Sequence, residues 1–112
     1  MNIIEQLKDR IQGKAPKGAK RSVLWRKVRK RHLKDNPTCA VCESKRRLQV
    51  HHKIPFHIAP HLELEPTNLV SLCENGKYGI VCHIAIGHLG NYRRTNPSCD
   101  LDIMIWNKKL RS

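Results

Sequence analysis

The chemically reactive side chains of this chain gather in three short segments. His51 and His52 are adjacent within Val50–Pro55, Asn68 opens a second apolar run, and His83 directly follows Cys82. Successive side chains of a strand point to opposite faces, so His51 and His52 can serve different purposes a short distance apart. Imidazole binds divalent metals and also accepts a proton near pH 7. The pair therefore predicts one metal ligand and one general base.

Four of the five cysteines form two pairs along the chain, Cys39 with Cys42 and Cys73 with Cys82. A structural zinc ion takes four tetrahedral ligands, and these cysteines supply that number. The second pair is more widely spaced than is usual for such sites. We predict a structural Zn²⁺ at the four cysteines, the alternative being two buried thiols and two incidental ones. Cys99 is predicted to be an ordinary free cysteine.

Hydrophobic periodicity and turn residues divide the chain into short elements. We predict an N-terminal helix and basic linker over residues 1–21, followed by one domain over residues 22–112. Within that domain the expected elements are a helix over 23–35, strands over 47–51 and 68–73, a helix over 80–86 and a helix over 101–110. The side chains expected to face the core from the two long helices are Leu24, Trp25, Val28, Leu33, Ile103, Met104 and Trp106.

The chain is strongly basic, with a formal net charge of +13 and a pI near 10.0. This charge indicates a polyanionic partner, and nucleic acid is favoured because phosphate neutralisation releases counterions. A membrane surface is disfavoured, since no basic helix has a broad aromatic face. No acidic residue interrupts residues 20–34, which predicts phosphate contacts there, although a solvated face is the alternative. The candidate DNA-binding residues are Arg26, Lys27, Arg29, Lys30 and Arg31.

The chain resembles the HNH nucleases, the ββα-metal endonucleases, in three motifs that occur in the same order. They are Val50-His51-His52-Lys53-Ile54-Pro55, Asn68–Cys73 and Cys82-His83. The Cys39 and Cys42 pair is typical of the branch that carries a structural zinc. The segment from Cys82 to Tyr92 looks more specifically like small phage-associated HNH proteins. The resemblance implies an α+β fold, with a small ββα-metal core, flanking helices and a structural zinc.

The resemblance also implies a role for each motif residue. His51 would bind the catalytic divalent ion, and His83 would be its second ligand. His52 would be the general base that activates water, and Asn68 would brace the loop that orients it. These roles make a metal-dependent DNA endonuclease that uses Mg²⁺, Mn²⁺, Ni²⁺ or Zn²⁺. The alternative is a zinc-stabilised DNA-binding module without catalytic activity.

Two spacings depart from the family pattern. The family often has another ligand four residues after the helix histidine, but that position is Gly87, and His88 follows it. A residue five positions along a regular helix lies about 140° around the axis. His88 can therefore be a ligand only if the helix ends or bulges at Gly87; otherwise it contacts phosphate or ends the helix. The second departure is the wide spacing of Cys73 and Cys82, which could shift His83 or disrupt the zinc site.

The resemblance to phage proteins implies a place in DNA packaging, with a phage terminase as partner. We expect a cytoplasmic protein, in the bacterial host cell if the chain is phage-encoded. A monomer would nick DNA, and a dimer could cut both strands. The remaining histidines are expected to be a surface residue, His32, and loop residues, His57 and His61.

Overall fold

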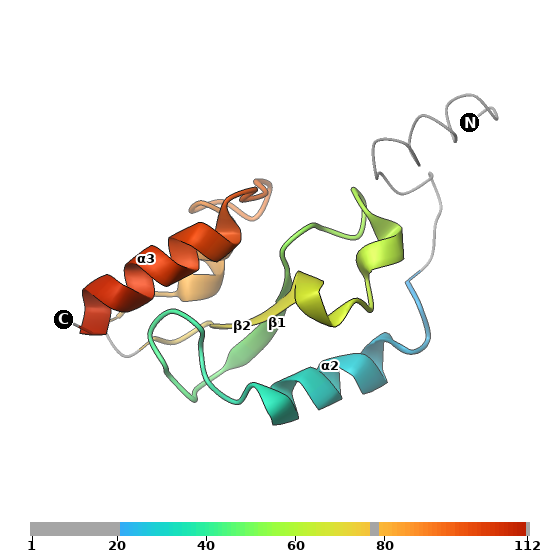
Figure 1. Ribbon diagram of the computed structural model, residues 1–112, viewed down its shortest axis with the longest axis horizontal. Helices are drawn as coiled ribbons and strands as arrows, with labels where there is room; N and C mark the ends of the chain where they lie inside the picture. The colour runs from blue at the N-terminus through green and yellow to red at the C-terminus, as the bar shows by residue number, and fades with distance from the viewer. Residues whose placement is uncertain (1–20, 77–78, 112) are drawn as a thin grey trace.

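The computed structural model describes residues 21–76 and 79–111. The predicted N-terminal helix and nearly all of the predicted basic linker lie outside these residues. The elements in chain order are helix α2 (Trp25–Asp35), strand β1 (Leu48–His52), the 3₁₀ turns η1 (Pro60–Leu62) and η2 (Pro66–Asn68), strand β2 (Leu69–Cys73), the π-helical turn η3 (His83–Gly87) and helix α3 (Cys99–Arg111). In Figure 1 the two strands lie between α2 and α3. The fold is α+β, as predicted.

Strands β1 and β2 form an antiparallel two-stranded sheet. His51 pairs with Val70, and His52 pairs with Leu69. The predicted strands are confirmed: β1 is displaced as a whole by one residue, and β2 begins one residue later than predicted. His51 is buried and lies against His88, which follows η3, whereas His52 is half-buried and lies against Trp25 of α2. The alternation of a strand therefore separates the two histidines, as their adjacency predicts.

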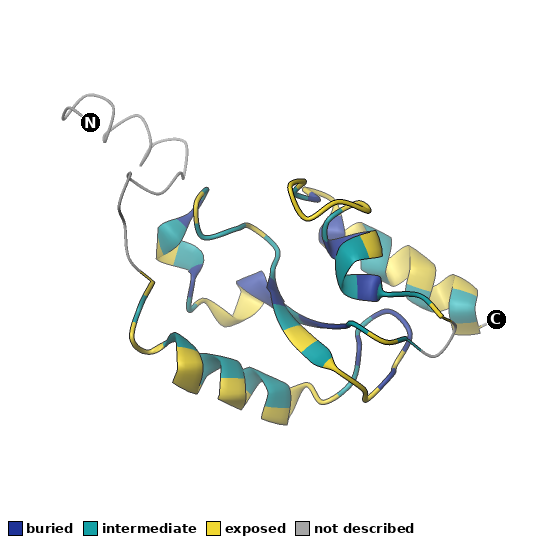
Figure 2. Ribbon diagram, turned by 180° about the vertical axis from the view of Figure 1, so that it is seen from behind, coloured by how far each residue is buried: buried dark blue, intermediate teal, exposed yellow. Residues whose placement is uncertain are grey.

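The core is small and consists largely of cysteine. Its seven buried residues are Cys39, Val41, Cys42, Leu72, Cys73, Cys82 and Ile86. Partly buried Leu48, Val70, Ile103 and others pack around them. Figure 2 shows this buried region in the middle of the molecule, with exposed residues along the outer sides of α2 and α3. Four of the seven buried side chains are thus polarisable thiol groups rather than large aliphatic groups, so apolar burial alone stabilises this fold weakly.

Helix α3 is rotated relative to the prediction. Ile103 faces the core as expected, but Met104 is 62% exposed and Trp106 is 42% exposed, so those two predictions were wrong. The cause is polar: the Asn107 amide donates to the Val41 carbonyl oxygen at 2.8 Å. This contact and the packing of Leu110 fix the face of α3 that meets the cysteine loop.

Helix α2 covers the sheet without burying any residue completely. Trp25, Val28 and Leu33 are half-buried, but Leu24 is 54% exposed because the helix begins one residue after it. The prediction of a buried Leu24 was therefore wrong. His32 also differs from the surface position predicted, since it is half-buried and its Nε2 atom is covered without a hydrogen-bond partner. No helix in the described residues has the length and apolar character needed to cross a bilayer.

Candidate active site and cysteine cluster

The four paired cysteines meet in one cluster. Cys39, Cys42, Cys73 and Cys82 are all buried, and their sulfur atoms lie within 4.8 Å of one another. A tetrahedral zinc site with Zn–S bonds of about 2.3 Å has sulfur atoms about 3.8 Å apart. The Cys42 and Cys73 sulfur atoms are 3.5 Å apart. The wide spacing of the second pair does not disperse the cluster, and the four thiols can hold a metal ion.

Local backbone structure presents the first cysteine pair. The Cys39 amide donates to the Ser44 carbonyl at 2.8 Å, and the Glu43 amide donates to the Cys39 carbonyl at 2.9 Å. Glu43 has a φ of 64°, so the chain turns sharply after Cys42. These bonds satisfy the buried backbone and turn both thiols inward.

The electrostatics of the cluster favour a cation. A hydrogen bond with the Cys82 thiol holds the pKa of Cys39 well below its usual range. The same hydrogen bond, together with burial, raises the pKa of Cys82, and burial raises that of Cys73. In the absence of a metal, neighbouring thiols thus share protons around a negative sulfur. A divalent cation can take the place of those protons, since thiolate is the form of cysteine that binds zinc.

A second cluster consists of three histidines. One ring nitrogen from each of His51, His83 and His88 lies within 4.8 Å of the other two. The ring centroids are 4.7 to 5.1 Å apart, and the rings meet edge to face. Burial lowers the pKa of His51 to about 3, with His83 and His88 contributing in the same direction. His51 is therefore neutral at pH 7 and keeps a lone pair available for a metal.

The hydrogen bonds of His83 and His88 determine which nitrogens carry hydrogen. His88 Nδ1 lies 2.9 Å from the Arg94 carbonyl oxygen, and His83 Nδ1 lies 2.5 Å from Glu74 Oε1. Both acceptors lack a proton to give, so each Nδ1 is the donor, and the neutral form of either ring has its lone pair on Nε2. These two Nε2 atoms are 3.2 Å apart. Two lone pairs at this distance repel unless a positive charge lies beside them, and ligands of a tetrahedral Zn–N site are about 3.4 Å apart.

The turn η3 explains how His88 reaches this cluster. A π-helix bonds residue i to residue i+5, so it places the fifth residue above the first, where a regular helix would not. The π-helical turn spans His83–Gly87, and the Gly90 amide closes it on the Ile84 carbonyl at 2.7 Å. The sequence predicted that His88 could reach the other histidines only if the helix ended or bulged at Gly87, and the π-helical turn ends there. The regular helix predicted over residues 80–86 was wrong in its type.

Gly87 is required here for space rather than for a special backbone angle. A Cβ atom added at Gly87 would lie 3.1 Å from His51 Cε1 and 3.1 Å from Leu72 Cδ1. Both neighbours are buried, so neither can move easily. The glycine at the usual ligand position thus leaves room for the His51 ring, and the ring of His88 reaches the cluster from the next position.

Replacing Gly87 with alanine should disturb the histidine cluster directly. We expect a loss of about 1–3 kcal/mol in the free energy of unfolding, the usual cost of overpacking, together with weaker Ni²⁺ binding. Denaturant titration and calorimetric titration of Ni²⁺ measure the two effects. Ala85→Ser, at an exposed position on the same turn, is the control. Unchanged Ni²⁺ affinity in Gly87→Ala would contradict the assigned contact.

His52 is held by a different set of contacts from His51. His52 Nε2 lies 2.9 Å from the Glu63 carbonyl oxygen, which can only accept, so Nε2 carries the hydrogen. Its Nδ1 is then the basic nitrogen of the neutral ring. Trp25 packs against the ring at a centroid distance of 4.4 Å. Burial lowers the pKa of His52, so the ring is neutral at pH 7 and able to accept a proton.

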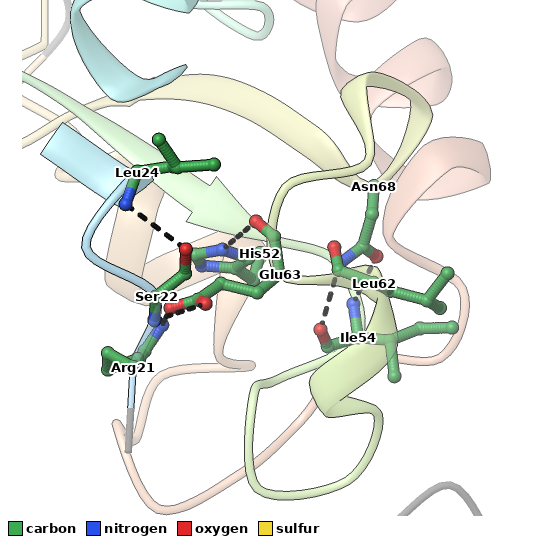
Figure 3. Close-up of polar contacts among 8 residues, drawn as sticks. All are labelled: Arg21, Ser22, Leu24, His52, Ile54, Leu62, Glu63 and Asn68. Carbon is green, nitrogen blue, oxygen red and sulfur yellow. Dashed lines mark hydrogen bonds and ion pairs between the residues drawn. The ribbon is translucent and has the colours of Figure 1, made fainter. Parts of the chain in front are cut away.

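Asn68 braces the loop between the strands. Its Oδ1 accepts from the Ile54 amide at 2.9 Å, and its Nδ2 donates to the carbonyls of Ile54 and Leu62 at 3.0 and 3.1 Å. Leu62 directly precedes Glu63, whose carbonyl receives the His52 hydrogen. Figure 3 shows the contacts of Asn68 with Ile54 and Leu62, and separately the contact of His52 with Glu63. The amide therefore lies where it can fix the acceptor that orients His52.

The side chain of Glu63 extends this network to the start of the described chain. It is buried, and Oε1 accepts from the Ser22 amide at 2.8 Å, while Oε2 lies 3.4 Å from the Arg21 guanidinium. Arg21 also lies over the Phe56 ring, 4.6 Å from its centroid. The segment entering α2 is thus joined to the residue that holds His52.

An open pocket of about 270 Å³ gives access to both sets of histidines. His51, His52, His83 and His88 line it together with Arg21 and His57. His57 is exposed and lies at this pocket, whereas His61 is exposed on η1. The structure therefore brings the predicted base, His52, and the predicted metal ligands, His51, His83 and His88, to one pocket. Asn68 braces the loop that holds His52.

Sequence reasoning missed four residues around the site: Arg21, Glu63, Glu74 and Tyr92. Tyr92 donates to both carboxylate oxygens of Glu74 and packs near His83 and His88, with ring centroids 5.5 and 5.0 Å away. The two glutamates had a weak signal in the sequence, since acids are scarce in this basic chain. Arg21 could not be singled out in the sequence, because many lysines and arginines surround it.

Together, the antiparallel strands, the following helical turn and the histidine cluster have the arrangement that the motifs predict, and a cysteine cluster lies beside them. The family model for HNH endonuclease matches residues 39–87, which run from the first cysteine through η3. This match covers the segment that carries the motifs, and it supports the resemblance to the HNH endonucleases that the motifs indicated. No curated protein and no solved structure is significantly similar to the chain.

Proposed function

We propose that this protein is a metal-dependent DNA endonuclease in which His52 is the general base and His51, His83 and His88 hold one divalent cation. The observation that carries the proposal is the close approach of the His83 and His88 Nε2 atoms, 3.2 Å apart, beside the buried His51 and at an open pocket. The HNH endonuclease domain supports DNA as the substrate.

The residues divide the hydrolysis between them. A divalent cation at the three histidines would polarise the scissile phosphate and stabilise the departing oxygen. His52 Nδ1 takes the proton from the attacking water, because its Nε2 hydrogen is committed to the Glu63 carbonyl. Asn68 and Trp25 keep the ring in this orientation. Imidazole ligands suit Mn²⁺, Ni²⁺ or Zn²⁺, while Mg²⁺ prefers oxygen and would depend more on the phosphate itself.

The basic side chains of α2 are proposed to contact the DNA backbone. Arg26, Lys27 and Lys30 are exposed, Arg29 is half-buried, and Arg31 is exposed but pairs with Asp35 at 2.9 Å. Their helix lies beside the site because Trp25, its first residue, packs on His52. Such contacts bind phosphate without reading sequence. The four buried cysteines are proposed to hold Zn²⁺, which their geometry fits.

The test is cleavage of supercoiled plasmid with Mg²⁺, Mn²⁺ or Ni²⁺, each with and without EDTA. We expect nicked or linear product with at least one metal and none with excess EDTA. Salt-dependent DNA binding without cleavage under every metal would instead indicate a zinc-stabilised DNA-binding module. A terminase partner is proposed on the resemblance to phage proteins, as is a place in the bacterial cytoplasm. Cleavage that is slow alone and faster with added terminase would support that partner.

Replacing Asn68 with alanine should reduce both stability and activity. Three hydrogen bonds are lost, each worth about 1 kcal/mol, so we expect a cost of about 3 kcal/mol in the free energy of unfolding. The cleavage rate should also fall at temperatures where the variant is folded, because the Glu63 carbonyl loses its brace. Asn107→Ala is the matched control, since it removes one amide contact in the cysteine loop. Equal rates for the two folded variants would contradict the bracing role.

A further inference from the structure

Two residues of the histidine centre directly follow ligands of the cysteine cluster. Glu74 follows Cys73, and His83 follows Cys82. The Glu74 carboxylate accepts the Nδ1 hydrogen of His83 at 2.5 Å. Rotation of the His83 ring would break this bond, so Glu74 fixes both the tautomer and the direction of the Nε2 lone pair.

The Glu74 carboxylate is itself held in place. The Tyr92 hydroxyl donates to its two oxygens at 3.3 and 3.1 Å, and the Glu74 amide donates to the Arg47 carbonyl at 2.9 Å. The side chains of Glu74 and His83 are only 22% and 16% exposed. The pair is therefore shielded from water and constrained on both sides.

The described residues Gly76 and Ile80 lie close together, next to Cys73. Cys73 Sγ lies 3.6 Å from the Ile80 carbonyl oxygen. A Cβ atom added at Gly76 would lie 2.1 Å from the same oxygen, so the chain passes there with no space for a side chain. Movement of either cysteine would be transmitted directly to Glu74 or His83, each one peptide unit away.

We propose that Glu74 is a positioning residue for the histidine metal centre, and that it couples this centre to the metal in the cysteine cluster. A metal ion in the cysteine cluster fixes Cys73 and Cys82, and thereby keeps the carboxylate on His83. The proposal extends the proposed function and rests on its assignment of a divalent cation to the three histidines. Carboxylate partners of metal-binding histidines typically contribute 10- to 100-fold to metal affinity, which sets the expected effect at about that size.

The first test is calorimetric titration of Ni²⁺ into zinc-loaded protein. Glu74→Ala should raise the dissociation constant of Ni²⁺ by about 10- to 100-fold. Glu74→Gln should lie between wild type and Glu74→Ala, because an amide oxygen still accepts the His83 hydrogen. Glu65→Ala, an exposed acid on the far loop, is the matched control and should leave the affinity unchanged. Wild-type Ni²⁺ affinity in Glu74→Ala would overturn the proposal.

A double-mutant cycle shows whether Glu74 acts through His83. In a His83→Ala background, Glu74→Ala should cause no further loss of Ni²⁺ affinity. An equal further loss would show that Glu74 acts by another route and would overturn the positioning role. Zinc content and thermal midpoint, measured on every variant, should match those of Glu65→Ala; a general loss of both would mean that Glu74 has only a structural role.

The coupling has a reciprocal consequence, because two ligands that affect each other do so by the same factor. Saturating Mn²⁺ should tighten zinc binding in wild type, measured by competition with a chelator that prefers zinc. The effect should disappear in Glu74→Ala. Equal zinc affinity with and without Mn²⁺ in wild type would overturn the coupling. A wild type that shows both effects but cuts no DNA would contradict the proposed function and leave the inference standing.

Discussion

His52→Ala is expected to reduce the rate of DNA cleavage by about 10²- to 10⁴-fold, the usual contribution of a general base. Nδ1 of His52 is the basic nitrogen, since its Nε2 hydrogen is bonded to the Glu63 carbonyl. His88 also donates to a loop carbonyl, that of Arg94, but its other ring nitrogen faces His83. His52 instead lies on the other face of β1, against Trp25. Single-turnover cleavage of a labelled duplex at saturating protein measures the chemical step separately from binding.

The control for His52→Ala is His57→Ala. His57 lines the same pocket but is exposed and has no assigned role in the chemistry. It should retain nearly all of the rate, and both variants should bind Ni²⁺ as tightly as wild type. If His52→Ala cuts as fast as His57→Ala, the assignment of the base is wrong.

Removing the metal from the cysteine cluster is expected to unfold the domain. Structural zinc in small domains contributes on the order of 10 kcal/mol, which is comparable to the whole stability of a typical domain. The seven-residue buried core contains the four cysteines themselves, so few aliphatic contacts remain without them. Far-ultraviolet circular dichroism during titration with a zinc chelator, followed by re-addition of Zn²⁺, measures this loss and its reversal.

A comparison of two cysteine variants separates metal binding from simple burial. Cys42→Ala and Cys99→Ala both remove a buried thiol, at 3% and 2% exposure. Only Cys42 belongs to the cluster, so Cys42→Ala should lose zinc and fold poorly, whereas Cys99→Ala should keep zinc and lose little stability. Similar thermal midpoints for the two variants would show that the cluster is not the main source of stability.

Local patterns were sufficient to predict the sheet and both clusters. The alternation of β1 predicts opposite faces for His51 and His52, and the order of the motifs places Asn68 and His83 near them. The sheet is predicted because it depends on strand periodicity. The cysteine cluster joins residues 31 positions apart, and it was expected from the ligand count of zinc. The meeting of His51 with His83 was expected from the resemblance to the HNH nucleases. His51 and His52 are adjacent in β1, and Cys82 and His83 are adjacent in the chain, so the relative positions within each pair are constrained.

The features that could not be predicted depend on contacts between distant residues. The rotation of α3 is set by Asn107 bonding to Val41, 66 positions away, so helical periodicity alone gave the wrong face for Met104. The π-helical form of η3 reflects the fit of Gly87 against His51, which no local propensity indicates. Glu63 and Arg21 are joined across 42 positions, and only the folded loop brings them together.

The pairing of His51 with Val70 also limits which insertions and deletions this domain can tolerate during evolution. A shift of one residue along β1 exchanges the faces of every side chain. Such a shift would turn His52 toward η3 and His51 toward Trp25. Each histidine would then lie among the neighbours of the other, and neither could keep its proposed role. Length changes within residues 48–52 should therefore be eliminated by selection. Changes within residues 56–61 leave the register intact, so that part of the loop can vary in length among descendants of this chain.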